Sequence, residues 1–193
     1  MKRTYTMGDR ADAVDTTRQR ILTAARTLFF ENWYDDVTLN GIASAAGVSH
    51  QTVLNHFGSK DGVLSAVTET LHAETAGLRS AAEPGNTDAA VQALVAQYET
   101  SGLANFRATC EEHRVPALKA ALDDARIWHR EWVERTFAHA LPASGTARRQ
   151  KIAAYLAATE VAAWKSLRHD YGFSKRDTAA AITTLIKALE VQP

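Results

Sequence analysis

Apolar residues recur every three or four positions along most of the chain, and the period of two that marks a half-buried β-strand is absent. Residues that favour helices, such as Ala, Leu, Glu, Arg and Gln, are plentiful, while proline occurs only four times. The clearest linker is Glu83-Pro84-Gly85-Asn86, because Pro and Gly together interrupt a helix. The sequence therefore predicts an all-α protein with a break near residue 84.

We expect eight helices, each bounded by a capping residue, a glycine or a proline. A flexible tail over residues 1–15 precedes the first of them, in which Ile21, Ala25 and Leu28 belong to one apolar stripe. The expected helices cover about residues 16–32, 39–46, 50–57, 60–82, 87–108, 116–140, 146–170 and 174–191.

Composition restricts where such a protein works. The 22 basic residues balance the 22 acidic ones, so any binding to nucleic acid must come from a local arrangement of charge. The single cysteine, Cys110, excludes an intramolecular disulfide and is typical of a reducing compartment. The N-terminus has no apolar signal-peptide region, and no apolar stretch approaches the roughly 20 residues that cross a bilayer. We therefore expect a soluble, cytoplasmic protein.

The most informative segment runs from Leu39 to Lys60 and reads LNGIASAAGVSHQTVLNHFGSK. Two short helices can cross closely if a small residue lies at their contact, and Ala43 is such a residue. Gly47 permits a sharp turn between them, since glycine adopts positive φ without steric cost. Ser49 can then cap the second helix. The residues expected to close a core between the helices are Ile42, Val48 and Val53. This arrangement is the helix-turn-helix, whose second helix enters the major groove of DNA.

Local charge favours this interpretation over a neutral helical hairpin inside a bundle. No Asp or Glu occurs from Val37 to Lys60, so this surface would not repel phosphates. Gln51 is the best candidate for bidentate reading of adenine, and Asn55 is the second. Thr52 can contact thymine, while His50 and His56 can donate to phosphate or guanine. The residues expected to contact phosphate, and so to position the domain, are Thr38, Ser49 and Lys60.

In these residues the chain resembles the tetracycline-repressor (TetR) family of transcriptional regulators. The resemblance implies a two-domain, all-α homodimer that usually represses transcription and releases DNA when a ligand binds. It also implies that Thr38, His50, Gln51, Thr52, His56 and Lys60 face DNA. Leu54 departs from the family pattern, which commonly has a tyrosine there that bonds phosphate. The residues that carry the resemblance are Arg20, Ile21, Leu22, Ala24, Ala25, Leu28, Phe29, Tyr34, Thr38, Ile42, Ala43, Ala46, Gly47, Val48, Ser49, His56, Phe57, Ser59, Lys60 and Leu64.

On this basis we expect an N-terminal helix-turn-helix domain of three helices at residues 16–62 and a ligand-sensing, dimerising helical bundle at 63–193. The helices at 146–170 and 174–191 would form a four-helix interface with a second copy, and a two-fold dimer would bind a palindromic operator. Candidates to line the effector cavity, with plain core packing as the alternative, are Phe106, Cys110, Trp128, Trp132 and Phe137.

Two other classes of protein fit the sequence less well. A helical enzyme acting on a small hydrophobic substrate is the first, but no nucleophile elbow, phosphate-binding glycine loop, His-Glu-x-x-His pair or dinucleotide fingerprint occurs. An architectural DNA-binding protein is the second, but it would not need the long segment after the linker. A metal site at His113 lacks a second His or Cys at ligand spacing, so neither a metal nor a cofactor is expected.

Overall fold

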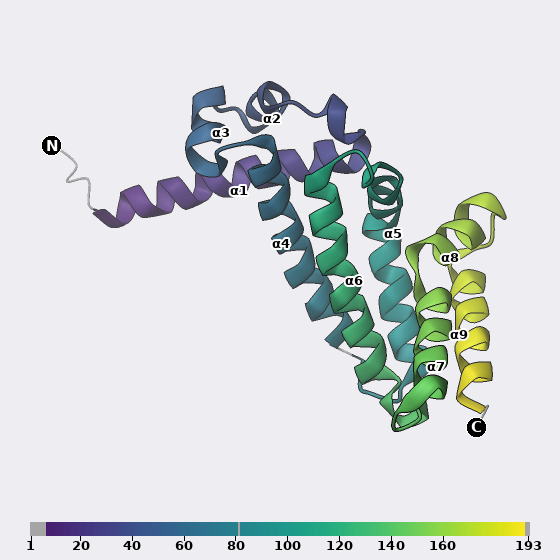
Figure 1. The fold of residues 1–193 in the computed structure, drawn as a ribbon. Helices are drawn as coiled ribbons and strands as arrows, with labels where there is room; N and C mark the ends of the chain where they lie inside the picture. Colours follow the sequence, from purple (N-terminus) through teal and green to yellow (C-terminus); the bar gives the residue numbers. More distant parts are fainter. Residues whose placement is uncertain (1–6, 81, 192–193) are drawn as a thin grey trace, which may run out of the picture. The chain divides into compact units, whose positions relative to one another are not determined.

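The computed structural model describes the backbone of residues 7–80 and 82–191 and the side chains of residues 14–80 and 82–190. Every regular element within these ranges is helical, so the predicted all-α class is confirmed (Figure 1). Over the same ranges, no helix has both the length and the apolar character needed to span a bilayer.

The chain divides into two compact units, up to Thr70 and from Leu71 onward. The first unit contains α1 (Met7–Glu31), η1 (Tyr34–Asp36), α2 (Leu39–Ala46), α3 (His50–Phe57) and the start of α4 (Lys60–Ser80). The second contains the rest of α4, then α5 (Thr87–Glu111), α6 (Pro116–Thr136), η2 (Ala138–Ala140), α7 (Gly145–Thr159), α8 (Val161–Lys165), the π-helical turn η3 (Ser166–Asp170) and α9 (Lys175–Val191). The division lies inside α4, eight residues beyond the predicted boundary, because this helix continues without a break.

The first unit reproduces the two short helices at the predicted residues, but its first helix is longer than predicted. α1 begins at Met7, so residues 7–15, which the sequence suggested as a flexible tail, are helical instead. No proline interrupts this stretch, and extending an existing helix adds one hydrogen bond for each residue ordered. Residues 1–6 of the predicted tail lie outside the described residues. The fully buried core of this unit comprises Ile21, Ala25, Ile42, Val53 and Val63.

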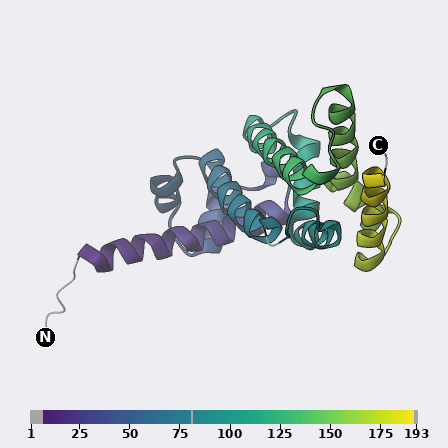
Figure 2. The same ribbon diagram turned by 90° about the horizontal axis from the view of Figure 1, so that it is seen from below.

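The second unit is a helical bundle in which α5 packs against α6, α8 and α9. α7 and α9 lie side by side, as the green and yellow helices of Figures 1 and 2 show. The core contains apolar residues of all five helices, namely Ala90, Val91, Leu94, Val95, Tyr98, Trp132, Val133, Phe137, Tyr155, Ala158, Val161, Trp164, Ala179, Ile182 and Ile186.

The prediction of a single helix over residues 146–170 is wrong, because the helix breaks at Thr159. The backbone carbonyl of Thr159 accepts a hydrogen bond from the Tyr98 hydroxyl at 2.9 Å, and the next residue, Glu160, has extended backbone angles (φ −64°, ψ 149°). Tertiary contact with α5 therefore takes a carbonyl that a continuous helix would have used. The helix predicted to reach residue 140 likewise ends at Thr136.

α8 packs directly on the backbone of α5. A Cβ atom at Gly102 would lie 2.4 Å from Cζ3 of Trp164, so only glycine allows the indole to approach this closely. The indole Nε1 donates to Oε1 of Glu99 at 3.0 Å, and the same oxygen accepts from Nε of Arg168 at 2.7 Å. The Arg168 guanidinium holds the pKa of the Glu99 carboxyl below its usual range. This contact fastens α8 and η3 to α5.

Residues 146–170 and 174–191, which the sequence suggested for a dimer interface, carry a stripe of mainly apolar side chains, and much of this stripe packs inside the protomer instead. Helical periodicity identifies an apolar face but does not say which surface covers it. The members of the stripe that are buried within the chain are Ile152, Tyr155, Thr159, Ala179, Ile182 and Ile186. On α9, Leu185 remains 53% exposed, so the face that carries Leu185 stays available to a second copy.

Candidate nucleic-acid interface

The turn between α2 and α3 has the hinge that the sequence predicted. Gly47 adopts a left-handed conformation (φ 63°, ψ 40°), and its N–H donates to the carbonyl of Ser44 at 3.1 Å. From α1, Arg20 Nη2 donates to the carbonyl of Ala46 at 2.6 Å and to that of Gly47 at 3.2 Å. A cation at the C-terminal end of α2 also interacts favourably with the helix dipole. Arg20 of α1 thus holds the turn between α2 and α3 in place.

Both short helices begin with the predicted hydroxyl caps. Thr38 Oγ1 accepts from the N–H of Gly41 at 3.0 Å, and Ser49 Oγ accepts from the N–H of Thr52 at 3.1 Å. Such caps satisfy backbone donors that the first turn of a helix would otherwise leave unpaired. α3 is therefore held firmly at the end that the sequence assigns to DNA.

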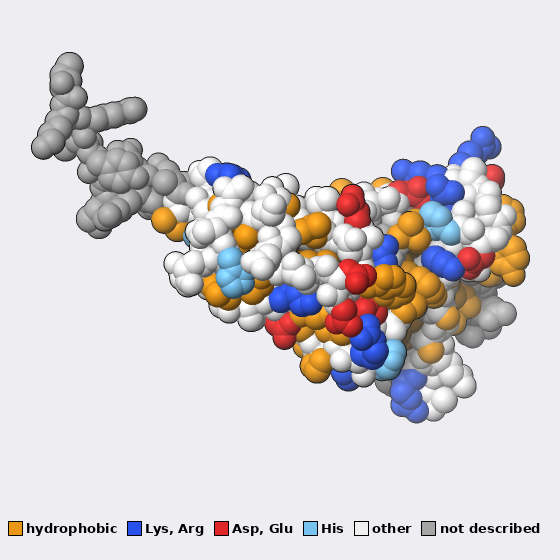
Figure 3. Space-filling model, turned by 90° about the horizontal axis from the view of Figure 1, so that it is seen from above, with side chains coloured by type: hydrophobic (Ala, Val, Ile, Leu, Met, Phe, Trp, Pro, Cys, Tyr) orange, Lys and Arg blue, Asp and Glu red, His pale blue; other side chains and the backbone are white. Residues whose placement is uncertain are grey.

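The polar residues of α3 lie at the surface of the first unit, as the prediction requires. His50, Gln51 and Asn55 are exposed, and Thr52 and His56 are half-buried; we call these five side chains the recognition surface. Figure 3 views the molecule from the side on which α2 and α3 lie, and the part beside the grey N-terminus is mainly uncharged. Gln51 Nε2 donates to Asn55 Oδ1 at 2.9 Å, which holds the two amides on one face of the helix.

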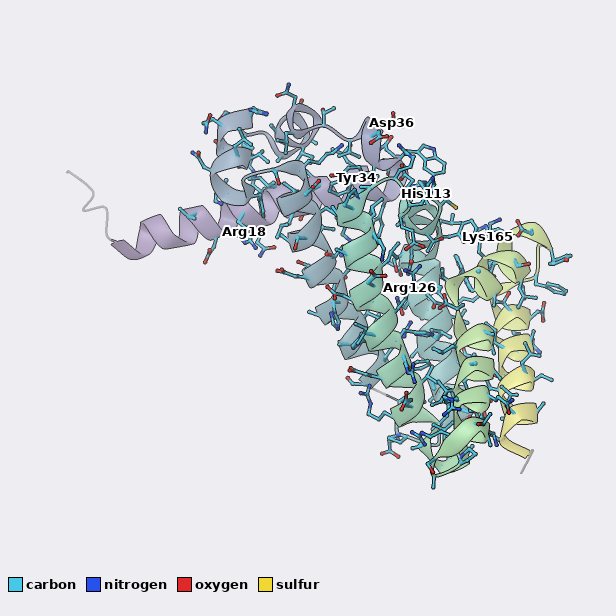
Figure 4. The ribbon with its side chains drawn as sticks, in the orientation of Figure 1. Arg18, Tyr34, Asp36, His113, Arg126 and Lys165 are labelled. Carbon is cyan, nitrogen blue, oxygen red and sulfur yellow. The ribbon has the colours of Figure 1, made fainter. Side chains whose placement is uncertain are left out.

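Lys60, predicted to contact phosphate, is engaged within the first unit. Its Nζ donates to the carbonyl of Tyr34 at 2.9 Å and lies 3.9 Å from the centre of the Tyr34 ring. Burial raises the pKa of the Tyr34 phenol, whose hydroxyl donates to Asp61, and Figure 4 labels Tyr34. An ammonium has three N–H donors, so the contact with Tyr34 does not exhaust its capacity. The phosphate role of Lys60 stays a prediction.

Sequence reasoning missed two arginines of α1 that add positive charge to this unit. Arg20 holds the hinge, and the guanidinium of Arg18, labelled in Figure 4, lies 4.8 Å from the ring centre of Phe57 in α3. The segment without Asp or Glu that pointed to DNA binding begins at Val37, so both arginines lie outside it. The available signal was their position in the expected first helix, Arg18 one turn before the buried Ile21 and Arg20 directly next to it. These two cations add positive charge to the first unit, although the net charge of the whole chain is zero.

The predicted effector residues separate into two groups. Trp132 and Phe137 are 1% and 0% exposed and meet edge-to-face with ring centres 5.9 Å apart, while Trp128, half-buried, meets His72 at 4.8 Å. Phe106 instead lies under Nζ of Lys165, 4.9 Å from its ring centre, and Cys110 is exposed. Trp132 and Phe137 therefore belong to the core, against which Phe106 also packs, whereas Cys110 lies at the surface.

Among the side chains that the structure describes, no three His, Cys, Asp or Glu residues gather closely enough to hold a metal ion. His113 is exposed after the end of α5.

Two short helices joined at a left-handed glycine, with an exposed polar second helix, form the helix-turn-helix arrangement that is typical of DNA-binding proteins. Residues 21–67 match the family described as bacterial regulatory proteins, tetR family. The N-terminal unit is thus similar to that of tetR-family regulators, and the similarity in sequence covers about a quarter of the chain.

Known proteins resemble the chain to different extents. The transcriptional regulator UidR of Escherichia coli K12 is 37% identical over 51 residues, which is 26% of each chain, so the alignment spans about a quarter of that relative. Two solved structures share the fold along nearly the whole length. A transcriptional regulator from Rhodococcus sp. Rha1 has a TM-score of 0.71 at 18% identity and covers 91% of this chain and 99% of its own. GusR of Salmonella enterica has a TM-score of 0.70 at 21% identity, with 90% and 95% covered.

Proposed function

We propose that this protein is a cytoplasmic, homodimeric regulator of transcription that binds a palindromic operator and leaves it when a small molecule binds. The observation that carries the proposal is the recognition surface, which is exposed on a capped helix within a segment free of carboxylates. A helix that meets DNA needs this combination of hydrogen-bonding side chains and absent negative charge.

Within this proposal the bases are read from α3. Gln51 Nε2 carries two hydrogens, one of which bonds Asn55, so its second hydrogen and its Oε1 can pair with adenine. The bond to Asn55 restrains the side chain before DNA arrives, which lowers the entropy lost on binding. The residues that would contact phosphate without reading sequence are Thr38, Ser49 and Lys60.

The second unit would supply dimerisation and effector binding. A two-fold pair of chains places two α3 helices on successive half-sites, roughly 34 Å apart for one turn of DNA. An effector that favours another spacing of the two helices would weaken operator binding by about 5- to 150-fold, a coupling of about 1–3 kcal/mol. The exposed Leu185 face of α9 is a candidate for the contact between copies.

Replacing Gln51 by alanine tests the recognition surface. We expect Gln51→Ala to relax the preference for one base in each half-site by about 5- to 150-fold, because a bidentate pair is worth about 1–3 kcal/mol of discrimination. Selection of bound sequences from random DNA measures this preference directly. Gln92→Ala, at an exposed glutamine of α5, is the matched control and should select the wild-type sequence. An unchanged base preference in Gln51→Ala would show that Gln51 does not read a base. A wild-type protein that selects no sequence would refute the proposed function.

A further inference from the structure

The second unit contains a buried arginine without an acidic partner. Arg79, near the end of α4, is 3% exposed. Its Nε donates to Oε1 of Gln97 at 2.8 Å and its Nη1 donates to Nδ1 of His129 at 2.8 Å. None of the carboxylates in the described part of the chain forms an ion pair with it; Glu160 attracts it only through space. A buried guanidinium is therefore paired with neutral groups.

The groups around Arg79 do not neutralise it. Burial and the neighbouring guanidinium lower the pKa of His129 to about 3, so the imidazole is neutral and accepts the Arg79 bond through Nδ1. The other ring nitrogen, Nε2, then donates to Oγ1 of Thr159 at 3.0 Å. Burial raises the pKa of Tyr98 to about 12, so this phenol is neutral as well. The cluster keeps one positive charge in an apolar core, where an uncompensated charge is costly.

Aromatic rings surround the same charge, and one of them has an unused donor. The guanidinium carbon of Arg79 lies 4.6 Å from the ring centre of Trp132 and 4.9 Å from that of Trp128. Trp132 Nε1 is fully buried and has no hydrogen-bond partner among the described side chains. A buried N–H without an acceptor is uncommon in native proteins and calls for an explanation. The cluster thus lacks an anion to pair with Arg79 and an acceptor for the N–H of Trp132.

Building on the proposed function, we propose that the effector is an amphipathic organic carboxylate, whose carboxylate pairs with Arg79 and accepts from Trp132 Nε1 and whose apolar body lies against Trp128 and Phe137. A guanidinium presents parallel N–H groups that fit the two oxygens of a carboxylate. The single buried charge matches a monoanion, while a phosphate dianion would leave one negative charge unbalanced. Aromatic walls with a few directed polar groups are typical of sites for small molecules.

The test uses the full-length protein and matched pairs of probes in isothermal titration calorimetry. The anions are sodium benzoate, phenylacetate, 1-naphthoate and decanoate, and each is compared with its uncharged amide. We expect at least one carboxylate to bind, and its amide to bind about 10- to 150-fold more weakly, the range for loss of a charge-assisted hydrogen bond. Arg79→Met should lower the affinity for that carboxylate by a similar factor and leave the affinity for the amide unchanged.

Two further variants make the result decisive. Arg79→Lys keeps the charge but loses the planar fork of N–H groups, so its affinity for the carboxylate should lie between those of the wild type and Arg79→Met. If Arg79→Met does not fold, Arg79→Lys takes its place in the test. Arg130→Met, at an exposed arginine of the same helix as Trp132, should bind as the wild type does. Equal binding of acid and amide, full affinity in Arg79→Met, or no binding by any carboxylate would overturn the proposal. Sequence-specific DNA binding by the wild type in the same preparation shows that the proposed function stands even when this inference fails.

Discussion

Replacing Trp164 by alanine lowers the free energy of unfolding by about 3–5 kcal/mol, the range for removing a large buried aromatic side chain. The indole is 2% exposed, packs against the bare backbone at Gly102 and donates to Glu99. Alanine leaves a cavity that the surrounding helices fill only in part, and the fixed approach of α8 to α5 is lost.

Differential scanning calorimetry measures the change, as a fall in the melting temperature of the protein of roughly 2–4 °C for each kcal/mol lost. Ile127→Ala, at a residue 60% exposed on α6, is the control and should stay within about 0.5 kcal/mol of the wild type. A loss at Trp164 no greater than that of the control would show that the Gly102 contact contributes little to stability.

Replacing Gly47 by alanine destabilises the first unit by roughly 2.5–5 kcal/mol, because two separate costs combine. The left-handed backbone at φ 63° costs a residue with a Cβ about 1–2 kcal/mol. That Cβ would also lie 2.8 Å from Nη2 of Arg20, which must move and give up its hydrogen bonds to the end of α2, at about 1.5–3 kcal/mol for a charged donor. Operator affinity should fall with stability, since α3 is held by this hinge.

Arg20→Met separates the two costs, because it removes the guanidinium but leaves the left-handed backbone of Gly47 unchanged. In the Arg20→Met background, Gly47→Ala should cost about 1.5–3 kcal/mol less than in the wild type, since no charged hydrogen bond remains to be displaced. Urea unfolding monitored by circular dichroism measures both costs. If Gly47→Ala costs the same in the two backgrounds, Arg20 does not hold the hinge.

Local signals were sufficient to predict the helix-turn-helix. Thr38, Gly47 and Ser49 act within their own turns, through caps and a positive φ, so a single sequence shows their effect. The exposure of Gln51 and Asn55 follows from the same helix, because its opposite face carries the buried Val53. Boundaries, caps and exposed face were therefore predictable together.

The second unit was predicted less well because distant contacts determine it. The break at Thr159 depends on the Tyr98 hydroxyl, which is 61 positions away in the sequence. Arg79 reads as an ordinary basic residue near a helix end, and its burial appears only when α5 and α6 pack around it with Gln97 and His129. Periodicity gives the apolar faces of α7 and α9 but not their partners.

His129 gives the second unit a sensitivity to acid. The folded protein keeps this imidazole unprotonated until pH falls to about 3, while in the unfolded chain it takes up a proton near 6.5. Between these values the unfolded state binds more protons, so stability declines as pH decreases through this window and is complete above it. Acidification below about pH 6.5 would thus destabilise the second unit at the Arg79 cluster.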